Sequence, residues 1–165
     1  MKRTISAFTL VAALLAAAGS GTLPATADAA AQSASGFGQT HLGLAFRNFA
    51  FSATKRADGT VTGQAQLYRQ DLGVLVHIEL DCLHARGNLA VVSGVVTSTN
   101  SATLPVGIDE LFVVKDNGDG PDAPADEITL VFDGLGLACT DLPPDPAFHA
   151  PFLFPIEHGQ IQVRA

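Results

Sequence analysis

Two runs of alternating residues around Asp71 and Leu72 constrain the fold of this chain more than any other feature. The runs are TVTGQAQLYRQ (60–70) and GVLVHIELDC (73–82). If Asp71 and Leu72 form the turn between them, one face of the hairpin carries only apolar or small pairs: Leu67–Val76, Ala65–Ile78, Gly63–Leu80 and Val61–Cys82. A slip of one residue would mix this face with the polar one, so the sequence predicts this register.

The same alternation recurs along the chain and predicts an all-β protein. Further strands are expected at Phe37–Leu44, Ala45–Lys55, 89–100, 110–116, 127–135 and 159–164. A two-residue hairpin turn is predicted at Asp58-Gly59 and another turn at residues 86–88, while Gly94 indicates a bulge or a close backbone approach. About seven or eight antiparallel strands predict one domain, a barrel or a sandwich.

Prolines fill the stretch TDLPPDPAFHAPFLFP, residues 140–155. A proline cannot donate to a strand ladder, so a central strand is excluded here. We expect an ordered surface loop held by Phe148, Phe152 and Phe154.

The N-terminal residues have the pattern of an export signal. Lys2 and Arg3 precede an apolar run and then small residues, which predicts a secretory signal peptide over 1–27. We expect a flexible linker over 28–35 and a single β domain over 36–165. The protein would then be secreted or periplasmic, without an integral membrane segment in its mature form.

Charge and cysteine content narrow the possible partners and the redox state. The formal net charge of −7 argues against nucleic acid as a partner. Cys82 and Cys139 are the only cysteines. In an oxidising compartment they are expected to form a disulfide, with two free buried thiols as the alternative.

An acidic, glycine-spaced loop, KDNGDGPDAPADE (115–127), presents carboxylates of the kind that calcium binds. Its spacing does not fit an EF-hand, so the calcium hypothesis rests on Asp116, Asp119 and Asp122 within the 116–126 loop. The alternative is a solvated loop turned at Asn117-Gly118 and Asp119-Gly120. No other cofactor is predicted.

The second face of the central hairpin is a candidate binding face. Its residues are Gln64, Gln66, Tyr68, His77, Glu79 and Asp81. Histidine with carboxylates is metal-ligand chemistry, but neighbours on one strand face are about 6.8 Å apart, so a solvated or partner-facing surface is the better interpretation. No hydrolase signature such as GxSxG or HExxH occurs, and no catalytic residue is predicted.

Five segments, DGTVTGQAQL, HIELDCL, GNLAVVSGVVT, VVKDNGDG and FPIEHGQIQVR, resemble a group of small exported bacterial all-β proteins of uncharacterised function. Related segments resemble post-COAP-type domains in larger bacterial surface proteins. The resemblance spans about Gly36 to Arg164. It implies export and one β domain, and it brings no catalytic residues.

These observations predict an exported, non-enzymatic β domain that acts as a binding or structural module for a protein or small-molecule ligand. One alternative is a calcium-stabilised extracellular module that uses the acidic loop. A weaker alternative is a small secreted hydrolase or isomerase built on a barrel.

Overall fold

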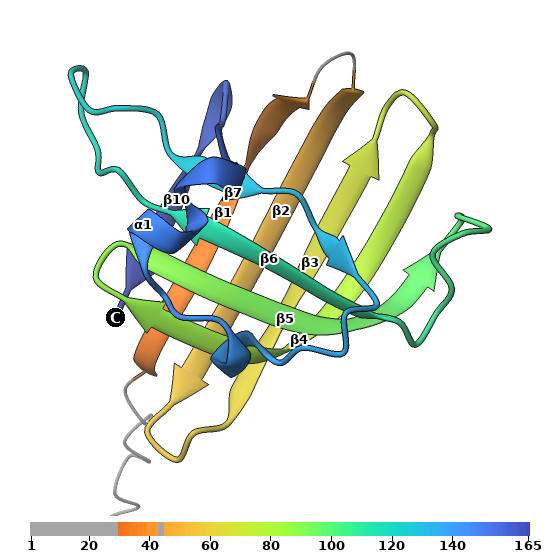
Figure 1. Ribbon diagram of the computed structural model, residues 1–165, viewed down its shortest axis with the longest axis horizontal. Coiled ribbons are helices and arrows are strands. Elements are labelled where there is room, and N and C mark those ends of the chain that lie inside the picture. The colour runs from red at the N-terminus through yellow and green to blue at the C-terminus, as the bar shows by residue number, and fades with distance from the viewer. Residues whose placement is uncertain (1–29, 43–44) are drawn as a thin grey trace, which may run out of the picture.

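The computed structural model describes residues 30–42 and 45–165, so the predicted signal peptide lies outside the described residues. Ten strands form one antiparallel sheet (Figure 1). They are β1 (Ala30–Leu42), β2 (Ala45–Arg56), β3 (Val61–Arg69), β4 (Val74–Arg86), β5 (Leu89–Thr99), β6 (Asp109–Lys115), β7 (Glu127–Thr129), β8 (Phe132–Asp133), β9 (Leu153–Pro155) and β10 (His158–Arg164). The all-β prediction is confirmed, with more strands than expected.

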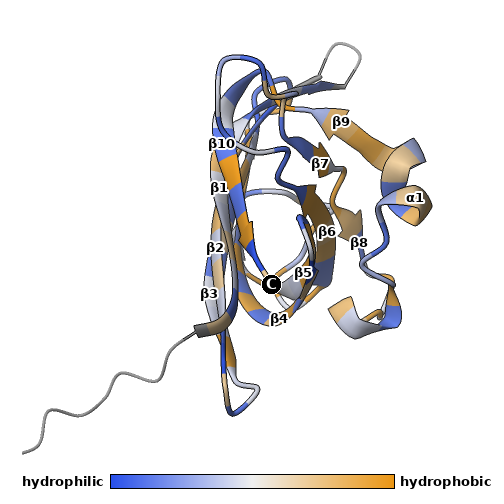
Figure 2. Cartoon of the chain, turned by 90° about the vertical axis from the view of Figure 1, so that its left-hand side faces the viewer, coloured by the Kyte–Doolittle hydropathy of each residue, from blue (hydrophilic) through white to orange (hydrophobic). Residues whose placement is uncertain are grey.

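The sheet runs in the order β10-β1-β2-β3-β4-β5-β6-β7-β9, and β8 also pairs with β6. It curls into a half-barrel in which β5 and β6 face β1, β2 and β3 (Figure 2). Apolar side chains fill the space inside the curl. The ring of Phe51 on β2 meets that of Phe112 on β6 edge to face, with centroids 5.4 Å apart. One curled sheet with a filled interior is therefore present, and the sandwich alternative was wrong.

Strands β5 and β6 are buried on both faces. Their inner side belongs to the interior core, while Leu89, Val91, Leu111 and Val113 form a second cluster on the outer side. Burial on both faces explains why these strands read as nearly continuous apolar runs rather than as alternation. The C-terminal segment, residues 134–152, covers this outer cluster with the short helices η1 (Cys139–Asp141), α1 (Pro146–His149) and η2 (Ala150–Phe152) (Figure 1).

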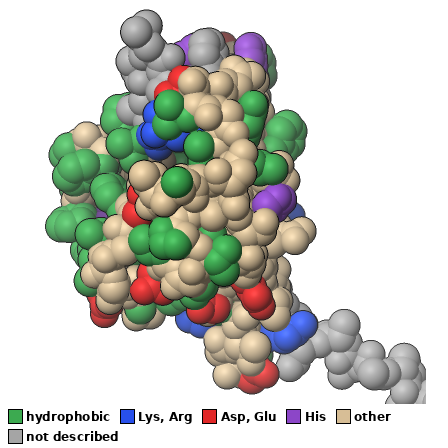
Figure 3. Space-filling model, turned by 90° about the vertical axis from the view of Figure 1, so that its right-hand side faces the viewer, with side chains coloured by type: hydrophobic (Ala, Val, Ile, Leu, Met, Phe, Trp, Pro, Cys, Tyr) green, Lys and Arg blue, Asp and Glu red, His purple; other side chains and the backbone are tan. Residues whose placement is uncertain are grey.

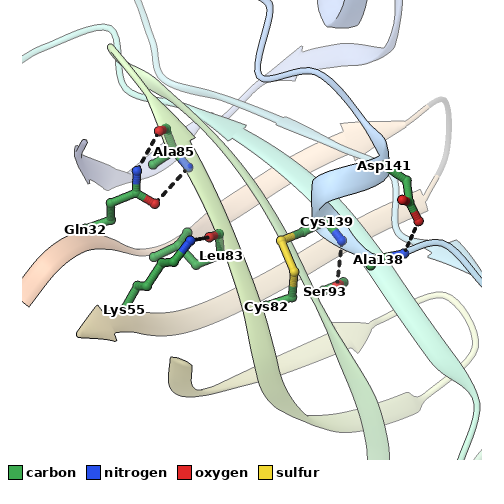
Figure 4. The surroundings of a disulfide bond; sticks show 9 residues. All are labelled: Gln32, Lys55, Cys82, Leu83, Ala85, Ser93, Ala138, Cys139 and Asp141. Atoms are coloured by element: carbon green, nitrogen blue, oxygen red, sulfur yellow. Dashed lines mark hydrogen bonds between the residues drawn. A yellow bond between two sulfur atoms is a disulfide. The ribbon is translucent and has the colours of Figure 1, made fainter. Parts of the chain in front are cut away.

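A disulfide attaches that segment to the sheet, which confirms the predicted bond. Cys82 on β4 and Cys139 on η1 are joined by an S–S bond of 2.06 Å (Figure 4). The backbone N–H of Cys139 also donates to Ser93 Oγ on β5 at 3.2 Å. The side-chain amide of Gln32 on β1 forms two hydrogen bonds with the backbone of Ala85 on β4. Its N–H donates to the Ala85 carbonyl, and its oxygen accepts from the Ala85 N–H.

The central hairpin has the predicted register from Gly63–Leu80 to Leu67–Val76. The predicted Val61–Cys82 pair was wrong, because the ladder ends at Gly63–Leu80. The pairing of β4 with β5 shifts register between Leu80 and Cys82. A bulge of this kind reverses which side of the sheet the following residues face. Cys82 consequently packs with the outer cluster, whereas Leu80 belongs to the inner core.

Gly94 lies where the backbones of β5 and β4 approach closely, which confirms its predicted role. A Cβ atom built on it would sit 2.0 Å from the carbonyl oxygen of Glu79. The turn at residues 86–88 is also confirmed, with Gly87 at φ 59°. The turn at Asp58-Gly59 is present but longer than predicted, because Arg56 donates to the carbonyl of Thr60 and three residues lie between them.

Several boundaries differ from those expected. The first strand begins at Ala30, so residues 30–35 belong to the sheet and not to a linker; they pair with β2, and from Ser33 onward with β10 as well. The strand expected at 127–135 is split into β7 and β8. The break occurs where the Thr129 hydroxyl, rather than a carbonyl, accepts the N–H of Val113 at 2.9 Å. Such a side-chain acceptor satisfies the buried N–H without a continuous ladder.

The proline-rich stretch is ordered, as predicted, but it is held partly by other contacts. Phe148 is 50% exposed and does not anchor it. The ring of Phe152 meets that of Phe132 on β8 edge to face, with centroids 6.4 Å apart, and Phe154 pairs with Ile128 of β7, so these two predicted contacts are present. The disulfide of Cys139 attaches the start of the stretch to β4, and within the stretch the ring Nε2 of buried His149 hydrogen-bonds with the Pro143 carbonyl at 2.8 Å. Hydrophobic side chains gather on the flank of the molecule that this segment forms (Figure 3).

Candidate functional site

Two rows of side chains cross the outer face of the half-barrel, on the opposite side of the sheet from the interior core. Strand pairing aligns one row as Gln160, Phe37, Ala50, Gln66, His77 and Ser98. It aligns the other as Gln162, Ser35, Ser52, Gln64, Glu79 and Val95. Because side chains alternate along a strand, the intervening residues point into the core. We call these two rows the polar face.

The middle of the polar face is hollow. Residues from both rows line a depression of about 1220 Å³, together with glycines and core residues that show at its floor. Ser35, Ala50 and Ser52 are short, so the rows are low between the longer glutamines, while the Cβ positions of Gly36 and Gly63 face the core on the other side of the sheet. The depression is large and partly open to solvent, unlike the enclosed pockets that surround small ligands.

Four of the six residues predicted for a binding face meet here: Gln64, Gln66, His77 and Glu79 all line the hollow. Tyr68 pairs with Leu75 one row further along, outside the hollow. Asp81 lies at the bulge of β4, beyond the paired part of the hairpin, and does not line it. The sequence interpretation therefore located the centre of the face but not its extent.

The hollow also has residues that sequence reasoning missed. Phe37 lies in it with 62% of its surface exposed, and Gln160 and Gln162 border it from β10. The alternation of small and polar residues in β1 and β10 indicates that these two strands each have a polar side. The neighbouring positions of β1 and β10 did not follow from it, because the two strands are more than a hundred residues apart in sequence.

Side chains at the centre of the polar face are available to a ligand. Gln64, Gln66, His77 and Glu79 make no side-chain hydrogen bond or ion pair with any other described residue. Each glutamine amide offers two N–H donors and a carbonyl acceptor. The face can therefore hydrogen-bond a ligand in both directions without breaking internal bonds.

The acidic loop has a structural task that the sequence did not reveal. Asp126 is 7% exposed, and its carboxylate accepts the N–H groups of Asn117 and Ile161, both at 2.7 Å. Asp116 likewise accepts from Gly118 at 2.8 Å and from Val163 at 3.0 Å. Ile161 and Val163 belong to the edge strand β10. These carboxylates thus replace a neighbouring strand and join the end of β6 to β10 across the opening of the half-barrel.

The calcium hypothesis concerned Asp116, Asp119 and Asp122. Asp116 is engaged as described, and Asp119 accepts a hydrogen bond from Gln160. Asp122 is exposed. Within residues 30–42 and 45–165, three or more potential ligands do not gather in one place. Calcium binding by this loop stays an alternative hypothesis.

The chain was compared with known proteins. No protein-family model matches it, and no curated protein or solved structure matches it either. The resemblance to exported bacterial β proteins therefore stays an interpretation of the sequence. Among the residues that the structure describes, no helix has the length and apolar character needed to cross a membrane.

Proposed function

We propose that this chain is an exported, non-enzymatic binding module that holds a neutral, hydroxyl-rich ligand, such as a polysaccharide chain, against its polar face. The observation that carries the proposal is the exposed ring of Phe37 among the amides of the hollow. An aromatic ring offers an apolar face with a polar surround, which is the surface that the C–H side of a sugar ring fits.

The other lining groups support the same ligand class. Amide, hydroxyl and imidazole groups predominate, and Glu79 is the only carboxylate among the described residues of the lining. These groups pair with hydroxyls in either hydrogen-bonding direction. A depression that is open on one side accommodates part of a long chain rather than enclosing a small molecule.

A filled interior also favours a surface site. Core side chains fill the inside of the curl and leave little room there for a ligand as large as a sugar chain, while the hollow on the outer face has a volume of about 1220 Å³. Secretion, inferred from the N-terminal sequence, would bring the face into contact with extracellular or periplasmic polymers. A protein partner that docks on this face is the competing possibility.

Affinity gel electrophoresis with neutral polysaccharides in the gel tests the proposal. We expect at least one neutral polysaccharide to retard the oxidised protein, and Phe37→Ala to weaken that binding roughly tenfold, equivalent to about 1.4 kcal/mol. The Gln64→Ala, Gln66→Ala double variant should weaken it similarly. Leu72→Ala is the matched control, because Leu72 is 61% exposed at a turn away from the hollow.

Two results would reject this ligand class. One is unchanged mobility in every neutral polysaccharide tested. The other is that a polysaccharide retards Phe37→Ala and the glutamine variant as strongly as it retards the control Leu72→Ala. A protein partner whose binding is lost in Phe37→Ala would assign the face to protein docking instead.

A further inference from the structure

A second, smaller cavity lies on the inner side of the sheet and is separate from the polar face. It has a volume of about 110 Å³ and is bordered by β2, β3, β4, β6 and β8. Leu67, Val76 and Val131 form part of an apolar wall and pack against the interior core. Its polar lining residues are Arg47, Asn48, Tyr68, Arg69, Glu110 and Asp133.

Unsatisfied polar atoms concentrate at this cavity. Four buried side-chain nitrogen or oxygen atoms of the described residues have no hydrogen-bond partner, and three of them belong to residues that line it: Arg47 Nε, Asn48 Oδ1 and Glu110 Oε2. Glu110 is only 2% exposed. A buried polar atom without a partner costs about 1–3 kcal/mol, so a cluster of them requires an explanation.

The two sides of the cavity offer complementary hydrogen-bonding groups. Glu110 and Asp133 are register partners on β6 and β8, and their side chains hydrogen-bond to each other. Burial, this hydrogen bond and the Asp133 charge raise the pKa of Glu110 to about 8, so Glu110 is protonated at neutral pH. With its proton shared with Asp133, Oε2 is left as an acceptor. Arg47 Nε is an unused donor.

Charge around the cavity is balanced. Arg47 pairs in register with Arg69, which forms an ion pair with Asp71 at 2.7 Å. Burial and the nearby Arg69 lower the pKa of Arg47, and Asp133 and Asp71 oppose that shift. With Glu110 neutral, the charged residues of the lining are Arg47, Arg69 and Asp133, and Asp71 neutralises Arg69 through its ion pair from outside the lining, so neither a cation nor an anion has a net electrostatic advantage.

We propose that this cavity is a binding site for a small neutral molecule with a short aliphatic body and a head group that both accepts and donates hydrogen bonds, best matched by a primary carboxamide. The amide oxygen accepts from Arg47 Nε, its N–H donates to Glu110 Oε2, and the aliphatic part packs on Leu67, Val76 and Val131. A cavity of 150 Å³ holds benzene, so this smaller one suits about five heavy atoms.

Propionamide, propionate and propionamidinium test the proposal, because they share one shape and five heavy atoms but differ in charge. Binding is followed by backbone amide shifts of the isotope-labelled, oxidised protein at pH 7. We expect saturable shifts with propionamide at Val76, Leu104 and Glu110, and binding of the two charged probes at least tenfold weaker.

Variants show whether Arg47 Nε and Glu110 Oε2, the two buried atoms without hydrogen-bond partners, bind propionamide. Glu110→Gln keeps the carbonyl acceptor and the ability to donate to Asp133, so propionamide binding should persist. Glu110→Met and Arg47→Met each remove one partner and should weaken it at least tenfold. Arg47 is only partly buried, so Arg47→Met provides this test even if Glu110→Met does not fold.

The proposal is overturned if none of the three probes gives saturable shifts, or if propionate or propionamidinium binds as well as propionamide. It is also overturned if Arg47→Met binds propionamide as the native protein does. None of these results bears on the polar face, which lies on the other side of the sheet.

Discussion

The carboxylate of Asp126 accepts the backbone N–H of Ile161 at 2.7 Å, thirty-five residues further along the chain. This contact joins the acidic loop to the last strand. Its second oxygen accepts from Asn117, so one buried side chain satisfies two backbone donors at the opening of the half-barrel. The loop that looked like a cation site in the sequence thus closes part of the sheet.

Replacing Asp126 with Ala should destabilise the fold by about 3 kcal/mol, because it leaves two N–H groups, one of them fully buried, without an acceptor. Asp126→Asn retains one acceptor oxygen and should cost roughly half as much. Urea unfolding of the three proteins measures the difference. Asp122→Ala in the same loop is the control, since Asp122 is exposed. Equal stability of Asp126→Ala and Asp122→Ala would show that the loop does not hold β10.

Calcium should leave the midpoint of thermal unfolding unchanged. The oxygens of Asp116 accept the N–H groups of Gly118 and Val163, and a metal ion would have to compete with those bonds. The measurement compares excess chelator with millimolar calcium. A calcium-dependent rise of several degrees that disappears in an Asp116→Asn, Asp119→Asn double variant would instead establish a calcium loop.

Local patterns predicted local structure well. The register of the central hairpin followed from alternation on both sides of one short turn, and the pairs from Gly63–Leu80 to Leu67–Val76 are present. The predicted register fails beyond Leu80, because β4 bulges at Asp81. That bulge depends on how β4 pairs with β5, which alternation within the hairpin does not show. The face of Cys82, and hence the direction in which the disulfide leaves the sheet, depends on that bulge.

Contacts between distant segments could not be predicted in the same way. Phe37 and Gln160 share the polar face only because β10 pairs with β1, and alternation does not reveal strand order. The partners of Asp116 and Asp126 are backbone groups, which every residue but proline carries, so side-chain identity gave no signal for them. Glu110 and Arg47 reach one cavity through the curl of the sheet.

Breaking the disulfide should lower stability and uncover the outer cluster. Cys82 and Cys139 are 57 residues apart, and the chain-entropy estimate for such a loop is about 4 kcal/mol. We expect a Cys82→Ala, Cys139→Ala variant to unfold at lower denaturant and to be cleaved first within residues 134–152, which cover Leu89 and Val113. Limited proteolysis of oxidised native protein is the reference. Cleavage at an unchanged rate and place would mean that packing alone holds the segment.

Stability should fall as pH rises from about 4.5 to about 8 through the titration of Glu110. Its pKa is raised from 4.5 to about 8 in the folded protein, so the folded state binds more protons than the unfolded state in that window. The stabilisation is complete below pH 4.5 and is lost through pH 8, with a slope of at most about 1.4 kcal/mol per pH unit.

Glu110→Gln isolates this contribution, because glutamine resembles the protonated acid and does not titrate. The native protein and the variant should be similarly stable at pH 5, and the variant should be the more stable of the two above pH 8. Urea unfolding across this range measures the difference, and histidine contributions cancel between the two proteins. Asp109→Asn on the same strand is exposed and should track the native curve. Parallel curves for native protein and Glu110→Gln would contradict the raised pKa.

Gly94→Ala should be among the most damaging single substitutions in the sheet. The added Cβ would lie 2.0 Å from the Glu79 carbonyl oxygen and 2.8 Å from its carbonyl carbon, both backbone atoms that cannot turn away. Strands β4 and β5 would have to separate at the bulge, and overpacking of this kind costs about 1–3 kcal/mol or more. Gly73→Ala is the control: its φ of 63° disfavours a side chain, but nothing lies within 4 Å of the new Cβ, so it should cost only about 1 kcal/mol. Guanidinium unfolding ranks the two variants, and a loss for Gly94→Ala no larger than for Gly73→Ala would show that β4 and β5 do not approach as closely in solution.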